Sequence, residues 1–407
     1  MPEGGALRAL PARRIAALVA DAAERWRDAD FAPRVRATAA IEARLGYTTP
    51  VVDFALDRLF GGVTVDALEA AIASELGTVD ALDGVVARDG APAAWARGVD
   101  RAVIVSSDTT IGVAVVPAMF ALCAKCDVVV KDRSDALVAA FFETLAEEHP
   151  AFARSASARA WRGGDDPDEP ALLADAGVVV AFGREDALRA IRDRCGAETR
   201  FVPFGHRAGI GVLSRDAAAS LDAGTAERIA RDALLYDGEG CLSLHALFVE
   251  AAGDELARVA SVLSAAFERV SVEFPAGAGS PERTARVAQY RDVAAFRAAG
   301  GRGAVFRAAG AVLVVDPPAS DPPPFLPRVL PVMPVAGDDD VVAYVAAHRL
   351  PVQVVGVASA GERALALAER VGAVRVAPFG AMQVPPLGGH HGGLPRIADF
   401  VRWIDRE

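Results

Sequence analysis

The chain has 407 residues, of which 52% are hydrophobic and 24% are charged, and its formal net charge is −11. This length allows at least two hydrophobic cores, and the composition predicts an ordered, soluble protein. The negative charge and the lack of a basic, aromatic-rich stripe exclude nucleic-acid binding as a function. No stretch approaches ~20 uninterrupted apolar residues, which excludes integral membrane contact through a spanning helix.

The first 26 residues predict an amphipathic helix rather than a targeting segment. The large and small apolar residues of this segment follow helical spacing: Ile15, Leu18, Val19, Ala22 and Trp26. A signal peptide would show a continuous apolar core and a small-residue cleavage site, and neither is present. We therefore expect a cytoplasmic protein.

Two of the four cysteines, Cys123 and Cys126, form a C-x-x-C at the end of a predicted helix. A redox or metal role would need partners, but there is no second C-x-x-C. The nearest histidine, His149, is at no standard ligand spacing. The cysteines as a set follow no pattern of a secreted disulfide protein. We predict two packed thiols and no metal site.

From residue 101 onward, short apolar runs alternate with helical stretches. The predicted strands of the first half cover 101–106, 127–131 and 177–182, with helices at 113–124, 135–148 and 184–194. A second alternation begins near Leu213. Its predicted strands cover 244–249, 311–315, 329–335, 352–357 and 373–376, with a proline-rich loop at 316–331. Such alternation is typical of parallel sheets, which bind ligands at the carboxyl ends of their strands.

Cys241 stands at a corner that suits a nucleophile. A predicted helix over 225–237 runs into Gly238-Glu-Gly-Cys-Leu-Ser243, and an apolar strand follows at once. The glycines leave the backbone open, so that a substrate carbonyl can approach closely. A thiolate attacks carbonyls and thioesters, and backbone N–H groups of such a corner can stabilise the oxyanion. The alternative interpretation is a small buried residue without a chemical role.

Three segments together resemble the aldehyde dehydrogenase superfamily, and more narrowly the acyl-CoA reductase family typified by the fatty-acid reductase subunit of bacterial bioluminescence. Val128-Val-Val-Lys-Asp-Arg-Ser-Asp135 is similar to the superfamily's strand that ends in V-V-K-P-S. Asp237-Gly-Glu-Gly-Cys-Leu-Ser243 is similar to the nucleophile segment. The tail from Gln383 to Asp405 looks like the ending of the reductase family. The resemblance covers residues 100–407.

The resemblance implies an α/β fold with a Rossmann-type cofactor domain and an α/β catalytic domain that carries the cysteine. We expect an N-terminal helical region and NADP-binding domain at 1–212 and a catalytic domain at 213–376. The tail, 377–407, is expected to fold back on the cofactor domain and to end in a helix at about 396–405. For Cys241, the resemblance implies an acyl thioester that NADPH reduces to an aldehyde.

The resemblance also implies a set of cofactor contacts. Lys131 matches a lysine that contacts the adenosine ribose, and Arg133 and Ser134 stand where they could meet a 2′-phosphate. Gly183 and Arg184 belong to the turn after the next strand, in which Leu188 replaces the superfamily's second glycine.

Several positions depart from the oxidising members. Pro203 replaces the general base, which favours acyl reduction over hydrolysis of the thioester. Asp108 replaces the asparagine of the oxyanion hole, so that either Asp108 is protonated or a neighbour donates. Arg328 stands where a ribose-binding glutamate is expected. His206 follows a glycine as in the reductases and suits an acid/base role, a cofactor contact or a structural role.

Gly240 allows close approach to the corner, and the resemblance suggests that His390 and His391 line the substrate mouth or the domain junction. A solvated glycine-rich turn is the alternative for the two histidines. The expected acyl donor is an acyl-CoA, an acyl phosphate or an acyl group from a partner protein, and we expect a homo-oligomer. The rival hypothesis is a scaffold or regulatory subunit with this fold and weakened chemistry.

Overall fold

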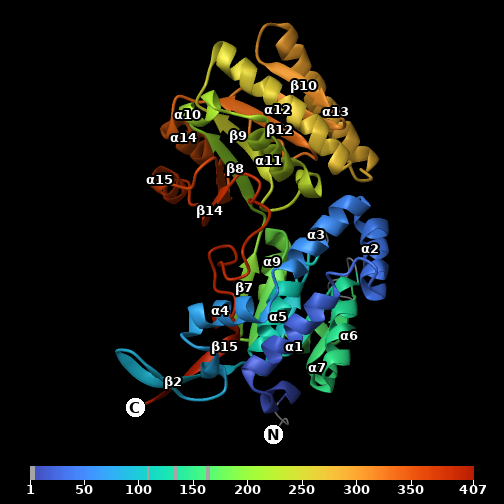
Figure 1. The fold of residues 1–407 in the computed structure, drawn as a ribbon, viewed down its shortest axis with the longest axis vertical. Coiled ribbons are helices and arrows are strands. Elements are labelled where there is room, and N and C mark those ends of the chain that lie inside the picture. The colour runs from blue at the N-terminus through green and yellow to red at the C-terminus, as the bar shows by residue number, and fades with distance from the viewer. Residues whose placement is uncertain (1–4, 108–109, 133–135, 162–165) are drawn as a thin grey trace. The chain divides into compact units, whose positions relative to one another are not determined.

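The computed structural model describes residues 5–107, 110–132, 136–161 and 166–407. Two compact units divide the chain (Figure 1). Unit 1 comprises Met1–Leu45, Val52–Gly205 and Pro386–Glu407, and unit 2 comprises Gly46–Val51 and His206–Pro385. Each unit has its own parallel sheet, and the two are described in turn.

The N-terminal helices of unit 1 pack around an aromatic cluster. The helical segments are η1 (Ala6–Ala9), α1 (Ala12–Arg25), α2 (Ala32–Leu45), α3 (Thr49–Gly61), α4 (Val65–Leu76) and η2 (Val79–Leu82). The apolar stripe predicted for the first helix is buried in α1. Trp26 stacks on Phe60 at 5.1 Å and donates a hydrogen bond to Thr144 Oγ1 at 3.1 Å. The prediction of an amphipathic helix here is confirmed.

The central sheet of unit 1 has five parallel strands in the order β5-β4-β3-β6-β7. Its strands are β3 (Arg101–Val105), β4 (Asp127–Lys131), β5 (Ala156–Arg159), β6 (Val178–Phe182) and β7 (Arg200–Phe204). The chain winds from β3 outward to β5 and then returns to place β6 on the other side of β3. This order creates a switch point between β3 and β6, where the carboxyl ends of an open sheet form a ligand-binding crevice.

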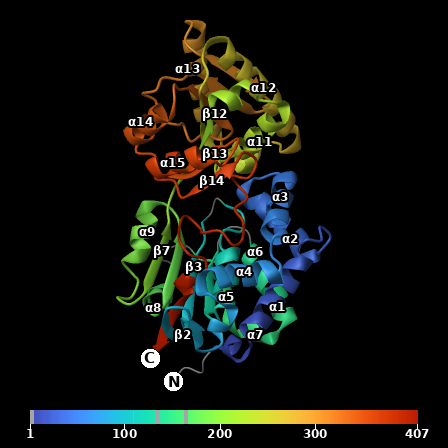
Figure 2. The same ribbon diagram turned by 60° about the vertical axis from the view of Figure 1, so that its left-hand side comes forward.

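Helices cover both faces of this sheet, which explains the valine-rich, buried strands. Figure 2 shows α8 (Glu169–Ala174) and α9 (Glu185–Arg192) on one side and α5 (Val115–Cys123) and α6 (Leu137–Glu148) on the other. The short helix α7 (Pro150–Ser155) leads into β5. Cys123 and Cys126 are fully buried, and burial raises the pKa of Cys123 to about 12. Among the described residues, no group of three or more His, Cys, Asp or Glu is placed to hold a metal ion.

A small antiparallel sheet of unit 1 corrects one prediction. Its order is β1-β2-β15, with β1 (Val86–Arg88), β2 (Ala91–Gly98) and β15 (Val401–Arg406). The helix expected at 396–405 is therefore wrong: only a short turn, η4 (Ala398–Phe400), precedes the strand. Trp403 pairs with Ala96 across the strands, and Arg88 lies over its ring at 4.6 Å. The strand partner supplied by β2 overrides a local pattern that also fits a helix.

Unit 2 contains a seven-stranded sheet in the order β10-β11-β12-β9-β8-β13-β14. The strands are β8 (Ala208–Leu213), β9 (Leu244–Val249), β10 (Ala304–Ala308), β11 (Ala311–Val315), β12 (Val329–Pro334), β13 (Val352–Val357) and β14 (Arg375–Pro378). All neighbours are parallel except the hairpin β10–β11. The sequence predicts the positions of β9, β11 and β13 to the residue.

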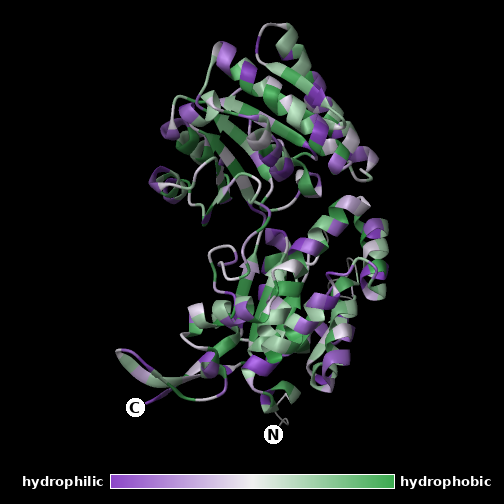
Figure 3. Ribbon diagram, in the orientation of Figure 1, coloured by the Kyte–Doolittle hydropathy of each residue, from purple (hydrophilic) through white to green (hydrophobic). Residues whose placement is uncertain are grey.

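The helices of unit 2 also lie on both faces of the sheet. In Figures 1 and 2, α11 (Ala223–Leu234) and α12 (Gly253–Glu273) lie opposite α14 (Asp338–His348) and α15 (Glu362–Arg370). The remaining helical segments are α10 (Arg215–Ala219), η3 (Leu235–Gly238) and α13 (Pro281–Ala299). Figure 3 shows strands that are mostly hydrophobic and helices with hydrophilic outer faces. Among the residues that the structure covers, no helix is long and apolar enough to cross a bilayer.

The boundary between unit 1 and unit 2 lies between Gly205 and His206, earlier than the expected boundary after residue 212. Strand β8 lies between β9 and β13 in the sheet of unit 2, so a boundary at 212 would cut it. Gly209 and Gly211 weaken the apolar pattern by which a strand is recognised in a sequence. Similarly, β14 at the edge of the same sheet extends to Pro378, and the part of the tail that joins unit 1 begins at Pro386.

Candidate functional site

The corner that carries Cys241 is a β-turn between α11 and β9. The amide of Ser243 donates a 2.9 Å hydrogen bond to the carbonyl of Gly240, which places Cys241 and Leu242 at the two central positions. Among the described residues, none accepts a hydrogen bond from the amide of Leu242 or, apart from the thiol of Cys241 itself, from that of Cys241. The turn thus presents two backbone donors beside a sulfur atom.

The backbone that leads into this turn is strained. Tyr236, Asp237 and Gly238 lie in succession in the left-handed region, with φ of 54°, 52° and 73°. A side-chain carbon at Gly238 would lie 2.8 Å from the carbonyl oxygen of Ala233, so glycine is required there. Non-glycine residues adopt this conformation at a cost of about 1–3 kcal/mol each, and such strain persists only where the surrounding structure enforces it.

Buried Arg328 enforces the strained segment. Its guanidinium lies 3.1 Å from the Asp237 carboxylate and also donates to Ser271 Oγ and to the carbonyl of Phe274. The amide of Gly277 donates to the same carboxylate at 3.1 Å. Only 3% of Arg328 is exposed. The Nη1 and Nη2 groups of Arg328 therefore hold the loop, whereas its buried Nε has no hydrogen-bond partner among the described residues. These contacts give this position a structural role instead of a ribose contact.

Gly240 is required by close packing. A side-chain carbon there would lie 2.9 Å from Gln383 Oε1 and 3.1 Å from Ser243 Oγ. Any larger residue would displace one of these polar groups. The glycine therefore serves the packing beneath the turn, in addition to leaving the backbone open.

The thiol of Cys241 is partly buried, and two groups partly offset the effect of burial on its ionisation. Burial raises the pKa of the Cys241 thiol, whereas its own backbone N–H and the charge of Arg207 lower it. Sequence reasoning named His206 and passed over Arg207, the next residue. A nearby arginine activates a cysteine because its positive charge stabilises the thiolate. The position of Arg207 directly after His206 was the sequence signal that could have identified it.

The two histidines of this region of unit 2 differ in character. Exposed His206 and buried His245 both contact the ring of Phe325, with centroid distances of 5.2 and 5.0 Å. His245 Nδ1 accepts a 3.2 Å hydrogen bond from the amide of Gly209. Burial, assisted by His206, lowers the pKa of His245 to about 4. His245 is therefore a neutral structural imidazole, and the exposed His206 is the one open to substrate or solvent.

In unit 1, Lys131 ends β4 in a buried polar cluster. Its Nζ lies 2.9 Å from Glu169 Oε1 and 5.0 Å from the ring centre of Trp161. Arg194 pairs with the other oxygen of Glu169 at 3.0 Å. The buried indole N–H of Trp161 has no hydrogen-bond partner among the described residues. A lysine and an orphaned donor at the carboxyl edge of this sheet fit the hydroxyl or phosphate groups of a dinucleotide.

Of the other predicted site residues, some lie outside the described part of the chain and the rest show no contact specific to a cofactor. Arg133, Ser134 and Asp108 lie outside the described residues. Gly183 follows β6, and a side-chain carbon there would meet only Ala187 at 3.7 Å, so packing does not require a glycine. The Arg184 side chain is 85% exposed and pairs with Asp186. Leu188, which replaces a superfamily glycine, is buried against the sheet beside Val179 and Ala181.

The adjacent tail histidines point into different surroundings. His390 is exposed, whereas His391 stacks on Phe204 with a centroid distance of 4.2 Å. Burial lowers the pKa of His391 to about 4, assisted by the charge of Arg396. The pocket beside His391 has a volume of about 20 Å³, room for one water molecule.

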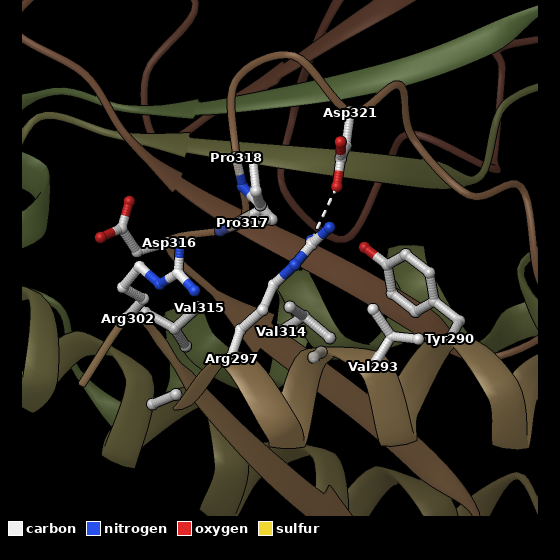
Figure 4. A pocket seen from close by; sticks show the side chains of 12 residues that line it. Tyr290, Val293, Arg297, Arg302, Val314, Val315, Asp316, Pro317, Pro318 and Asp321 are labelled. Carbon is white, nitrogen blue, oxygen red and sulfur yellow. Dashed lines mark hydrogen bonds and ion pairs between the residues drawn. The ribbon is translucent and has the colours of Figure 1, made fainter. Parts of the chain in front are cut away.

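A further pocket of unit 2, of about 70 Å³, lies between α13 and the loop that follows β11 (Figure 4). Arg297 and Asp321 form a 2.8 Å ion pair across it, and Tyr290 borders it. None of its lining residues belongs to the Cys241 corner. Its volume holds a few water molecules and no fatty acyl chain.

The arrangement of elements is that of the aldehyde dehydrogenases. The chain is similar to the aldehyde dehydrogenase KauB from Pseudomonas aeruginosa, with 14% identity and a TM-score of 0.73 over 99% of this chain and 86% of that one. It is also similar to an NAD-dependent benzaldehyde dehydrogenase from Corynebacterium glutamicum, with 16% identity and a TM-score of 0.68 over 98% and 87% of the two chains. Glyceraldehyde-3-phosphate dehydrogenase GapN from Methanocaldococcus jannaschii, solved with NADP, gives 10% identity and a TM-score of 0.69 over 98% and 90%.

At the level of sequence, residues 7–403 match the family described as acyl-CoA reductase (LuxC). The protein belongs to this family and is an oxidoreductase with an aldehyde-dehydrogenase-like fold. Among proteins with curated descriptions, none matches the chain significantly. The family resemblance noted from three segments is thus confirmed over nearly the whole sequence.

Proposed function

We propose that the protein reduces an activated fatty acyl group to the aldehyde through a thioester on Cys241, with NADPH as the reductant. The observation that carries the proposal is the turn itself: a partly buried thiol beside the backbone N–H groups of Cys241 and Leu242, for which no described residue other than the thiol itself supplies an acceptor. A thiolate at this position can attack an acyl carbon, and the two amides can hold the oxygen that becomes negative.

The atoms and electrons of the reaction balance as follows. The Cys241 thiolate adds to the acyl carbon of an acyl-CoA, and the CoA thiolate leaves and takes up a proton. Two electrons and a proton, equivalent to one hydride, added to the acyl group give the alkoxide of a thiohemiacetal on Cys241. Its collapse breaks the C–S bond, releases the aldehyde and restores the thiolate. Splitting the reduction in this way replaces one difficult step by two easier ones.

The dinucleotide would supply the hydride, and the carboxyl edge of the unit 1 sheet would hold it. Lys131 and the indole N–H of Trp161 are the donors that favour this place, with Gly183 and Arg184 after β6, on the other side of β3. The preference for NADPH over NADH rests on Arg133 and Ser134, which follow Lys131 in the sequence.

Pro203 favours reduction over oxidation. It lies in β7, in the segment where oxidising relatives are expected to carry a general base, and proline has no proton-accepting side chain. Water is then poorly activated, and the thioester survives until it is reduced. For acid/base assistance we propose the exposed His206, and for the oxyanion hole Asp108 in its protonated form or a neighbour. Exposed His390 keeps its proposed place at the substrate mouth, whereas the stacking of His391 supports a packing role.

The test is intact-mass spectrometry after mixing the protein with a long-chain acyl-CoA and no reductant. We expect a mass increase of one acyl group, absent in Cys241→Ala, retained in Cys195→Ala, and discharged when NADPH is added. Cys195 is a partly buried thiol of unit 1 and serves as the control. An adduct that forms only with an acyl phosphate or an acylated protein would change the donor. A chain that is acylated by none of these and binds no NADPH would instead be the catalytically weakened scaffold.

The donor, the assembly and the location stay predictions of the sequence. We propose an acyl-CoA or an acyl-transferring partner protein as the donor, a homo-oligomer as the assembly and the cytoplasm as the location.

A further inference from the structure

The segment that follows β14 packs beneath the Cys241 turn, on a strip of the sheet that carries no side chains. Gly209 and Gly211 of β8 and Gly356 of β13 form this strip. A side-chain carbon at Gly209 would lie 3.0 Å from Met382 Cε, and one at Gly211 would lie 2.9 Å from a ring carbon of Phe379. Gly211 and Gly356 therefore make room for Phe379 and Met382, which are both buried, whereas Gly209 lies against the carbonyl of Ser243 as well as against Met382.

Polar contacts fix the same segment to the helix before the turn. Asp232, fully buried in α11, accepts hydrogen bonds from the amides of Gly380 at 2.6 Å and Met382 at 3.2 Å. Arg375 donates to the carbonyls of Ala381 at 2.7 Å and Met382 at 2.6 Å. The segment is thereby held in one conformation, and the next side chain along it, that of Gln383, is aimed at the turn.

Gln383 joins both ends of the corner. Its Nε2 donates to the carbonyls of Asp232 at 3.0 Å and Leu235 at 3.2 Å, at the end of α11. Its Oε1 accepts a 3.2 Å hydrogen bond from Ser243 Oγ, at the last position of the Cys241 turn. The side chain is buried, and it fills the space that Gly240 leaves. One side-chain amide thus ties the residue before the strained loop, Leu235, to the last residue of the nucleophile turn, Ser243.

We propose that Gln383 is the positioning residue of the nucleophile turn: acting through Ser243, it sets the orientation of Cys241 and of the backbone amides of Cys241 and Leu242. The inference deepens the proposed function and rests on it where acyl transfer is concerned. Gln383 touches no reacting atom. Its effect is on the geometry in which the thiolate attacks and the oxyanion is received, so that its loss lowers kcat for acyl transfer and leaves KM for the acyl donor unchanged.

The experiment is a double-substitution cycle with Gln383→Met, Ser243→Ala and the two combined. The first readout is the pH profile of Cys241 alkylation by iodoacetamide, without acyl donor or reductant. We expect each single variant to raise the apparent pKa of the thiol, because the turn no longer holds the Cys241 N–H toward its sulfur. We expect the double variant to equal Gln383→Met, since the contact that Ser243→Ala removes is already lost in that variant. Equal profiles for wild type and variants, or effects that add, would overturn the proposal.

The second readout is the rate of acyl transfer from an acyl-CoA. The loss of one buried hydrogen bond in Ser243→Ala predicts a fall of about fivefold in kcat, and Gln383→Met, which also loses its two bonds to the carbonyls at the end of α11, should fall at least as far. Gln353→Met, at a buried glutamine of β13, is the matched control and should leave both readouts at the wild-type value. If the control also shows a raised apparent pKa of the thiol and a lowered kcat, general loosening of unit 2 explains the result and the proposal is overturned.

A third variant separates positioning from bulk packing. Gln383→Glu keeps an oxygen for Ser243 but offers a donor to the helix carbonyls only when it is protonated. Its rate relative to wild type should therefore rise toward one as the pH falls, and a ratio that does not change with pH contradicts the proposal. If the wild type itself fails to form the acyl adduct, the proposed function falls, while the alkylation cycle still decides the role of Gln383.

Discussion

Arg328 lies 3.1 Å from Asp237, a residue 91 positions away in the sequence and four residues before Cys241. The two backbones are joined as well, because the amide of Arg328 donates a 2.9 Å hydrogen bond to the carbonyl of Asp237. Both residues have positive φ, 55° for Arg328 and 52° for Asp237. Each strained residue thus holds the other, and together they fix the entry to the nucleophile turn.

Replacing Arg328 should destabilise the protein strongly. Arg328→Met leaves the Asp237 carboxylate without its ion-pair partner in a site where little water can replace it. We expect a loss of about 3–5 kcal/mol in the free energy of unfolding. Urea denaturation followed by far-ultraviolet circular dichroism, which reports on the helices of unit 2 as well as those of unit 1, measures it. Arg283→Met is the control, because that arginine forms a half-exposed ion pair with Glu239 and should cost at most about 1 kcal/mol. Similar losses in the two variants would contradict the assignment.

Arg207 should tune the reactivity of Cys241. Because its charge lowers the pKa of the thiol, Arg207→Ala should shift the alkylation profile of Cys241 to higher pH. Arg207→Lys keeps the charge and should lie close to the wild type. If the lysine variant shifts as far as the alanine variant, the charge of Arg207 is not the cause.

Asp232 should give the protein a stability that falls as the pH rises. Burial raises the pKa of this carboxyl from 3.8 to about 7, offset in part by the amides of Gly380 and Met382 and by the charge of Arg375. The folded state therefore favours the protonated form. This contribution is complete below about pH 4 and is lost between about pH 4 and pH 7.

Asp232→Asn removes the titration, at the cost of one of the hydrogen bonds from the amides of Gly380 and Met382, because the NH2 group of asparagine cannot accept. Its free energy of unfolding, relative to that of wild type, should be higher at pH 8 than at pH 4.5. Chemical denaturation at the two pH values measures the difference. The exposed Asp216→Asn in α10 serves as the control and should follow the wild type at both values. A constant offset for Asp232→Asn would show that the carboxyl does not titrate in this range.

Buried His245 acts in the opposite direction. Its pKa is lowered from 6.5 to about 4, so the folded state favours the neutral ring. The stability that this provides is complete above about pH 6.5 and is lost as the pH falls toward 4. His245→Gln should therefore lose less stability than wild type between pH 7.5 and pH 5. His390→Gln, at an exposed position, should lose as much as wild type over the same interval.

Lys131 should contribute to dinucleotide binding. A hydrogen bond to a charged group contributes about 1.5–3 kcal/mol, so Lys131→Ala should weaken NADPH binding by about tenfold or more. Quenching of protein fluorescence on titration with NADPH measures the affinity, without any acyl substrate. Lys125→Ala, which removes a buried lysine paired with Asp83, controls for lost stability of unit 1. An unchanged affinity in Lys131→Ala would mean that Lys131 serves Glu169 alone.

Much of the fold could be predicted from local pattern. The strands β4, β9, β11 and β13 begin and end where their apolar runs do, because strands buried on both faces leave a continuous valine-rich signal. Strand β8 could not be predicted in this way, because Gly209 and Gly211 interrupt its apolar pattern. Its glycines serve the packing of Phe379 and Met382, a requirement set by residues some 170 positions later. The terminal strand β15 depends on β2 in the same way.

The residues of the candidate site also fall into those that local sequence predicts and those that depend on distant contacts. Cys241 and Gly240 could be proposed from sequence because the corner is local. Gln383 and Arg328 could not be assigned a role, since each acts on the corner through contacts with distant positions. Glu169 was also missed, because its partner Lys131 lies 38 residues earlier and nothing in the sequence near Glu169 points to it.

Most of unit 2 is inserted into the sequence of unit 1, and this order constrains how the chain can fold during its synthesis on the ribosome. The strand β15, which completes the antiparallel sheet of unit 1, is translated after the whole of 206–385. One edge of strand β2 therefore lacks its partner, β15, while residues 206–385 are synthesised. Domains generally fold as units during synthesis. The nucleophile corner is thus expected to acquire its shape in a nascent chain whose first unit is still unfinished.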